Sequence, residues 1–113
     1  MKGQCFVKAF EALEKFYHSG ANPVLVHGVV TGEGDLKGVK YKHAWVEIGD
    51  LSDKTRTIVI DNTVSEGFSM PANEYYERGQ ITITKKYSYK GALTQILDYE
   101  HWGPWDECFK SYL

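Results

Sequence analysis

Three residues in the first two-thirds of the sequence, Cys5, His43 and Asp61, are of the types that make up a nucleophilic catalytic triad. A cysteine is a nucleophile in its thiolate form. A histidine can accept the thiol proton and later give it to a leaving group, while a carboxylate orients the imidazole and stabilises its charged form. Such a set would support the attack of a thiolate on a carbonyl carbon, provided that the fold brings the three side chains together.

Cys5 lies at the start of a predicted helix. Apolar residues recur at helical spacing, which predicts an amphipathic helix over Cys5–His18. They are Phe6, Ala9, Phe10, Leu13, Phe16 and Tyr17. In a first helical turn the backbone N–H groups are unpaired and the helix dipole is positive, and both favour a thiolate. Cys5 also belongs to the apolar face, so on its own it is more simply explained as a small hydrophobic residue of the core.

The strands that follow could bring His43 and Asp61 together. Three β-rich segments predict strands, and they are Val24–Thr31, Tyr41–Ile48 and Thr57–Asp61. If the polar turn between the last two is centred on Ser52, an antiparallel register places His43 directly opposite Asp61, where Cβ atoms lie about 4.5–5.5 Å apart. An imidazole and a carboxylate can hydrogen bond at that separation. An ordinary cross-strand ion pair would account for the same two residues.

The remaining segments complete an α+β arrangement. We expect an irregular segment over Gly67–Arg78 with one helical turn near Asn73–Tyr76, then a strand over Gln80–Tyr89 and a helix over Ala92–Glu100. A first helix followed by strands with short connections predicts an antiparallel sheet with helices packed on it. The 113 residues fit a single domain over residues 1–113.

Three short motifs, in this order along the chain, resemble a known family. They are Gly3-Gln4-Cys5-Phe6-Val7, His43-Ala44-Trp45-Val46-Glu47 and Asp61-Asn62-Thr63. The first is similar to the Gly-Gln-Cys-Trp-Val stretch around the nucleophile of transglutaminases. The second and third resemble the His-Ala-Trp-x-Glu strand and the Asp-x-Thr sequence of the wider transglutaminase-like superfamily.

The resemblance implies a papain-like core, in which the helix carrying Cys5 packs on the sheet and Cys5, His43 and Asp61 form the triad. It also implies thioester chemistry, in which a peptide or amide carbonyl acylates Cys5 and water or an amine then releases the acyl group. The superfamily includes peptidases, amidases, deamidases and crosslinking acyltransferases, so hydrolysis and transfer both stay open. We expect a peptide or protein substrate, and the oligomeric state is left open.

Two departures from the family pattern concern the oxyanion hole. Phe6 stands where a tryptophan usually follows the nucleophile, and only four residues precede Cys5, where family members carry a segment that often supplies an oxyanion donor. The remaining candidates for oxyanion or substrate binding are the Cys5 backbone N–H, Gln4, Trp45, Trp102 and Trp105. Losing one such donor costs about 10²–10³ in rate. The alternative function is therefore a weak or inactive binding or inhibitory module that uses its aromatic C-terminal surface.

Other polar and aromatic residues have simpler explanations. If the glycine-rich loop turns near Leu36, His27 would share a sheet face with His43, but a hydrogen-bonded histidine of the core or rim is favoured. Glu47 is interpreted as a surface carboxylate. The aromatic residues near the C-terminus could line a contact surface, and we favour the second half of the core. They are Tyr87, Tyr89, Tyr99, Trp102, Trp105 and Tyr112.

Composition and charge argue against several classes of protein. The formal net charge is −2, which offers no broad positive surface for nucleic acid or an anionic membrane. No apolar run approaches the roughly 20 residues of a membrane-spanning helix, and no apolar signal-peptide region follows Lys2, so we expect a cytoplasmic protein. Neither a Cys-x-x-Cys nor a His-x-x-x-His pattern occurs, so we expect no metal and no cofactor. Cys108 is interpreted as structural, and a disulfide between it and Cys5 would block the nucleophile.

Overall fold

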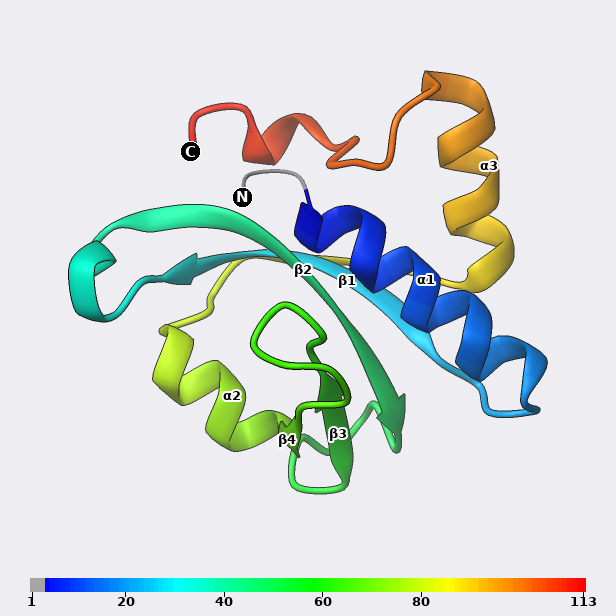
Figure 1. The fold of residues 1–113 in the computed structure, drawn as a ribbon, viewed down its shortest axis with the longest axis horizontal. Coiled ribbons are helices and arrows are strands. Elements are labelled where there is room, and N and C mark those ends of the chain that lie inside the picture. Colours follow the sequence, from blue (N-terminus) through cyan, green and yellow to red (C-terminus); the bar gives the residue numbers. More distant parts are fainter. Residues whose placement is uncertain (1–3) are drawn as a thin grey trace.

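A computed structural model describes residues 4–113, so Gly3 of the cysteine motif lies outside the described residues. Within them, five antiparallel strands form one sheet in the order β4-β3-β2-β1-β5, and helices cover both of its faces (Figure 1). The strands are β1 (Val24–Thr31), β2 (Lys40–Gly49), β3 (Thr57–Ile60), β4 (Ser69–Pro71) and β5 (Thr84–Tyr87). The helices are α1 (Gln4–His18), α2 (Ala72–Gly79) and α3 (Tyr89–Tyr99), with 3₁₀ turns η1 (Gly34–Leu36) and η2 (Glu107–Phe109). The expected α+β class, with an N-terminal helix packed on an antiparallel sheet, is confirmed.

The helix α1 packs its apolar stripe against one face of the sheet. Phe6 and Leu13 of α1 are buried in one cluster with Leu25 of β1 and Val46 of β2. This cluster forms because residues three and four apart share a helix face, while alternate residues share a strand face. The helix α3 joins it through Ala92, which is fully buried. The helix that carries Cys5 is therefore held in place by β1 and β2.

The helix α2 covers the opposite face of the sheet. Trp45 of β2 and Val59 of β3 are fully buried there, together with Ala72 at the start of α2. The Trp45 ring centroid lies 5.1 Å from that of Tyr75 on α2. The strand β2 therefore contributes side chains to the cores on the two faces of the sheet, and packing in these two cores fixes its position.

The elements predicted up to Asp61 are confirmed to within one residue at each end. Their apolar periodicity is strong, because each packs one or both faces in a core. The later predictions were less accurate. The segment expected to be irregular contains β4 and a two-turn helix, α2, rather than a single turn. The predicted last helix is confirmed, but it begins three residues earlier, at Tyr89.

Local capping explains these differences. Gln80 adopts a left-handed conformation (φ 50°), which ends α2, and the Ile81 N–H then bonds the Tyr76 carbonyl at 3.0 Å. This turn delays the last strand until Thr84, four residues later than predicted. The Ser88 side chain accepts a hydrogen bond from the Gly91 N–H at 3.0 Å and so starts α3 early. No helix in the described part of the chain is long and apolar enough to cross a membrane.

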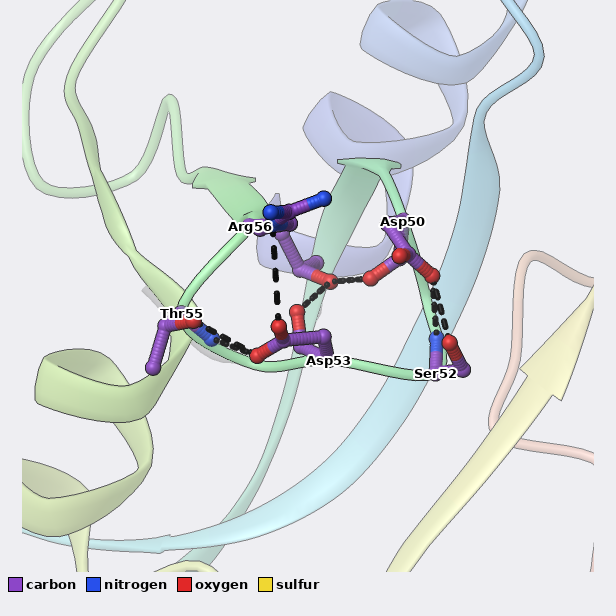
Figure 2. A network of polar contacts seen from close by, with 6 residues as sticks. Asp50, Ser52, Asp53, Thr55 and Arg56 are labelled. Carbon is purple, nitrogen blue, oxygen red and sulfur yellow. Dashed lines mark hydrogen bonds and ion pairs between the residues drawn. The ribbon is translucent and has the colours of Figure 1, made fainter.

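The turn between β2 and β3 sets the register of these two strands (Figure 2). Asp50 Oδ1 accepts bonds from the Ser52 N–H at 3.1 Å and from its hydroxyl at 2.6 Å. Asp53 Oδ1 accepts the equivalent bonds from Thr55 at 2.9 Å and 2.6 Å. The Thr57 hydroxyl donates to the backbone oxygens of Asp50 and Asp53 and joins the two halves of the turn. The turn is therefore centred on Asp53, one residue later than the predicted centre at Ser52.

Candidate active site

The structure brings the three predicted triad residues together. Cys5 is the second residue of α1, His43 lies in β2, and Asp61 directly follows β3. Their exposed fractions are 7%, 8% and 2%, so all three are buried. Both partners lie at the His43 ring: it hydrogen bonds the Asp61 carboxylate at 2.8 Å, while Cys5 lines the same cavity as His43 and helps to raise the pKa of His43.

The shortness of β3 explains how residues from both faces of the sheet reach His43. Within residues 4–113, β3 pairs with β2 only over 46–49, so residues 40–45 of β2 pair with β1 alone. One edge of β2 is therefore open beside His43. At this edge Cys5, from the α1 side, and Asp61, from the α2 side, meet the same imidazole ring.

The predicted pairing of His43 directly opposite Asp61 is wrong by two residues. Val46 pairs with Ile60, which places Asp61 level with Trp45 if the register is continued. A two-residue difference keeps every side chain on its own face, because strand side chains alternate with period two. His43 and Asp61 are thus diagonal neighbours on one face, and His43 Nε2 still donates to Asp61 Oδ2 at 2.8 Å.

The Asp61 carboxylate is held by three donors. Its Oδ2 accepts bonds from His43 Nε2 at 2.8 Å and from the Tyr75 hydroxyl at 2.7 Å, while Oδ1 accepts the Thr63 N–H at 3.0 Å. Burial by itself raises the pKa of Asp61, but the bond and charge of His43 and the other two bonds lower it below its ordinary value. Asp61 is therefore a buried carboxylate that stays ionised.

His43 is poised to keep its proton. Burial by itself lowers the pKa of His43, but the hydrogen bonds and charges of Asp61 and Cys5 outweigh burial and raise it to about 9. Because Nε2 bonds Asp61, Nδ1 is the ring nitrogen left for Cys5.

The raised pKa of His43 predicts a pH dependence of stability. From its ordinary value of 6.5 up to about 9, the folded protein holds a proton that the unfolded chain has lost. The free energy of unfolding should therefore fall with pH in this window, by about 1.4 kcal/mol per pH unit, and the contribution should be complete below pH 6.5. Urea unfolding of the wild type and His43→Gln across pH 6–10 measures it. The difference in the free energy of unfolding between the two proteins should shrink as pH rises. A difference that stays constant with pH would contradict the raised pKa of His43.

Two cavities meet at His43. The larger, of about 640 Å³, is lined by Cys5 and by Gly103 and Pro104 of the tail. The smaller, of about 390 Å³, lies on the Asp61 side. Three residues line both, and they are Tyr41, His43 and Thr63. A substrate carbonyl can therefore reach Cys5 through the larger cavity without displacing the Asp61 carboxylate.

The tryptophans predicted as oxyanion or substrate-binding residues are placed elsewhere. Trp45 is completely buried, and its indole N–H donates to Glu47 Oε2 at 2.9 Å. The Trp105 indole N–H donates to the His101 carbonyl at 3.0 Å. Trp102 is 43% exposed. In the described part of the chain, none of the three lines either cavity.

Gln4 and Tyr41 are polar side chains near the candidate triad, and they could replace the tryptophans as oxyanion donors. Gln4 is exposed at the first position of α1, next to Cys5. Tyr41 is half-buried, and its ring centroid lies 6.0 Å from that of His43. Burial, followed by the charges of Asp61, Cys5 and Glu33, raises the pKa of Tyr41, so its hydroxyl keeps its proton. Tyr41 was not predicted, although its spacing of two from His43 places both on one strand face.

Tyr75 is a second site residue that was not predicted. It lies on α2, in the segment that the sequence pattern described as irregular with one helical turn. Its hydroxyl donates to the same Asp61 oxygen that His43 contacts. The sequence carries no signal for this contact, because Tyr75 follows Asp61 by 14 positions and a complete loop and strand lie between them.

Glu47 is not the surface carboxylate that we expected. Only 1% of it is exposed, because the strand β2 is central and α2 covers this face. Its Oε2 accepts bonds from the Trp45 indole and the Tyr76 hydroxyl, and its Oε1 pairs with Lys86 Nζ at 3.1 Å. A buried carboxylate is tolerated when it is paired and hydrogen bonded. The Glu47 network thus anchors α2 and β5 to the strand that carries His43.

His27 lies in the core, as expected, but the expectation that it is hydrogen bonded is wrong. It pairs with Ala44, so it faces α1 rather than sharing a face with His43. It is fully buried, and neither ring nitrogen has a hydrogen-bond partner among the described residues. Phe6 and Trp105 rings lie 4.9 Å and 4.8 Å from its own. Burial and the charge of His101 lower the pKa of His27 to about 3, so it is neutral.

The aromatic residues near the C-terminus are divided between the core and the surface. Tyr87, Tyr89 and Trp105 pack against the α1 core, whereas Tyr99 and Trp102 are 57% and 43% exposed. Cys5 and Cys108 are both free thiols. Cys108 is exposed, so burial does not support the structural role that we expected for it.

Comparisons with known proteins give no match: no family model, no curated protein and no solved structure is similar to this chain. In the described part of the chain, no group of three His, Cys, Asp or Glu residues could hold a metal ion. The function must therefore be argued from the geometry around Cys5, His43 and Asp61.

Proposed function

We propose that this protein is a thiol-dependent hydrolase or acyltransferase that acts on peptide or amide bonds, with a transglutaminase-like, papain-like core. The observation that carries the proposal is the buried His43 ring, which is bonded to an ionised Asp61 through Nε2 at 2.8 Å and lines one cavity together with Cys5. Asp61 orients the ring and stabilises its charged form, so that Nδ1 faces the thiol.

The reaction follows from these positions. The Cys5 thiolate attacks the amide carbonyl, and the C–N bond breaks as the His43 imidazolium gives its proton to the leaving nitrogen. The products of this half-reaction are a thioester on Cys5 and an amine. Neutral His43 then takes a proton from water or an acceptor amine as that nucleophile attacks the thioester. The C–S bond breaks, the acyl group leaves as a carboxylic acid or a new amide, and the thiolate and imidazolium are restored.

The oxyanion formed in each step needs donors near Cys5. The start of α1 supplies the Cys5 backbone N–H, which has no acceptor within its own first turn. Tyr41 lines the cavity that contains Cys5, and among residues 4–113 its hydroxyl makes no hydrogen bond. We assign these two groups to the oxyanion hole, with Gln4 as a third candidate. They take the place of the tryptophans, whose indoles lie outside both cavities.

Intact-mass detection of an acyl-enzyme tests the proposal. The protein is exposed to a library of peptides and glutamine amides, quenched with acid, and mapped by peptide fragmentation. A mass increase on Cys5 is expected in the wild type and in Cys108→Ala, the matched control for the second thiol. Cys5→Ala should show none, and Tyr41→Phe should form the adduct about 10²-fold more slowly. Adducts on Cys108 alone, or none on the wild type, would overturn the proposal.

A second candidate, a non-catalytic binding module, is favoured by the exposed apolar residues of α3 and the tail. Leu97, Tyr99 and Trp102 are 76%, 57% and 43% exposed. Exposed aromatic side chains are typical of contact surfaces. Absence of any Cys5 adduct would support this candidate.

The two free thiols suit a reducing compartment, and for either function we propose a cytoplasmic location.

A further inference from the structure

The cavity that contains Cys5 has one basic side chain in its described lining. Eleven of the described residues line it, and Lys42 is the one lysine or arginine among them. None of the described residues lining it is an aspartate or glutamate. His43 already pairs with Asp61 at 2.8 Å, so Lys42 is the cation of this lining that has no carboxylate partner among residues 4–113.

Lys42 has no partner for its charge. It is half-buried, and among residues 4–113 it forms no ion pair, whereas Lys85, Lys86 and Lys110 each pair with a carboxylate. It lies on the strand face of Ala44 and Val46, which pack against α1, so its side chain is on the Cys5 side of the sheet. A lysine on the wall of a mainly apolar cavity, with no carboxylate partner among the described residues, is available to pair with an anionic group of a ligand.

The rest of the cavity wall is mainly apolar. The aliphatic and aromatic residues that contribute are Phe6, Leu36, Val39, Pro104 and Leu113. Leu36 and Leu113 are 50% and 61% exposed. Exposed apolar side chains at the rim of a concave site are typical of surfaces that a ligand covers. The ligand that suits the cavity therefore combines an apolar group with a negative charge.

We propose that the cavity at Cys5 selects amide substrates that carry an apolar side chain together with a carboxylate, and that the carboxylate pairs with Lys42. This selectivity rests on the proposed function, since it names the substrate class of the same site. The carboxylate can come from a peptide C-terminus or from an acidic side chain, which present the same charge and the same two oxygens. Because Lys42 precedes His43 on β2, one strand would position both the substrate and the general base.

Binding to a protein that cannot turn over separates this proposal from the catalytic one. Cys5→Ala is titrated by calorimetry with four peptides: acetyl-Leu-Gly, acetyl-Leu-Gly-amide, acetyl-Leu-Glu-amide and acetyl-Leu-Gln-amide. At least one acid should bind about tenfold more tightly than its neutral partner, and the acid that does so identifies the source of the carboxylate. Equal binding of both acids and their amides, or no detectable binding, would overturn the proposal.

A matched pair of lysine variants assigns the effect. In the Cys5→Ala background, Lys42→Gln should remove the tenfold preference for the acid. Lys40→Gln should retain it, because Lys40 is exposed on the same strand and lies outside the cavity lining. A preference that survives Lys42→Gln would also overturn the proposal. An acid preference in a protein that forms no acyl-enzyme would refute the proposed function and leave the binding assignment standing.

Discussion

Replacement of His43 by alanine is expected to lower the rate at which an amide-directed electrophile acylates Cys5 by about 10³–10⁴-fold. The variant loses the group that holds the thiol proton, and it leaves the buried Asp61 carboxylate without its main partner. Acylation is followed by intact mass under conditions in which the wild type is labelled to completion. Because a buried charge loses its pair, stability is measured alongside, and labelling is compared at a temperature where both proteins are folded.

Variants of Asp61 and Tyr75, which lie behind His43, should lower the rate of Cys5 acylation to different extents. Asp61→Asn keeps the shape of the side chain but removes the charge that stabilises the imidazolium, so we expect a loss of about 10²–10⁴-fold. Tyr75→Phe removes one of three donors to Asp61 and leaves the His43 bond, so a loss of about tenfold is expected. His18→Ala, an exposed histidine in the last turn of α1, is the matched control and should be unchanged. Equal labelling of the wild type and His43→Ala would remove the basis for a triad.

Substitution of Gly28 by alanine is expected to destabilise the fold by about 1–3 kcal/mol. Gly28 lies on β1 opposite His43, and a Cβ there would meet Trp45 Cη2 at 2.5 Å and the Ile83 carbonyl oxygen at 3.1 Å. Trp45 is fully buried and packs against Tyr75, so its ring has no free space to move into. Thermal unfolding should show a fall in Tm of several degrees or more.

Gly91→Ala is the control for this prediction. Gly91 lies in the first turn of α3, and a Cβ there would meet only the Ser88 hydroxyl oxygen, at 3.2 Å. Alanine is favoured over glycine in a helix by about 1 kcal/mol, so this variant should be neutral or slightly stabilised. If Gly28→Ala unfolds at the same temperature as Gly91→Ala, the close packing of Trp45 over β1 is incorrect.

Local patterns in the sequence were sufficient for the elements that carry the candidate site. The apolar spacing of α1 and the β-rich runs of β1, β2 and β3 predicted each element to within one residue. These segments pack against cores on one or both faces of the sheet, and burial imposes the periodicity that makes them recognisable. The residue types and order of Cys5, His43 and Asp61 identified the site before any contact was known.

Where long-range packing decides the structure, the sequence pattern was insufficient. The helix α2 is mostly polar, with Ala72 its one buried residue, so it shows no apolar stripe to predict it. The burial of Glu47 depends on Trp45, Tyr76 and Lys86, which lie on three different elements. The prediction that Glu47 is a surface carboxylate was wrong because no local sequence pattern indicates partners such as Tyr76 and Lys86, which come from distant parts of the chain.

The sequence by itself predicted the residues of the candidate triad and the faces of the strands on which His43 and Asp61 lie. Only the tertiary structure decided how they meet. The hydrogen-bonded turn centred on Asp53 shifted the register by two residues, which preserves the faces and replaces a direct pair with a diagonal one. The early end of β3 then opened the edge of β2 at which Cys5 reaches His43, because strand length depends on backbone pairing between distant segments and not on side-chain type alone.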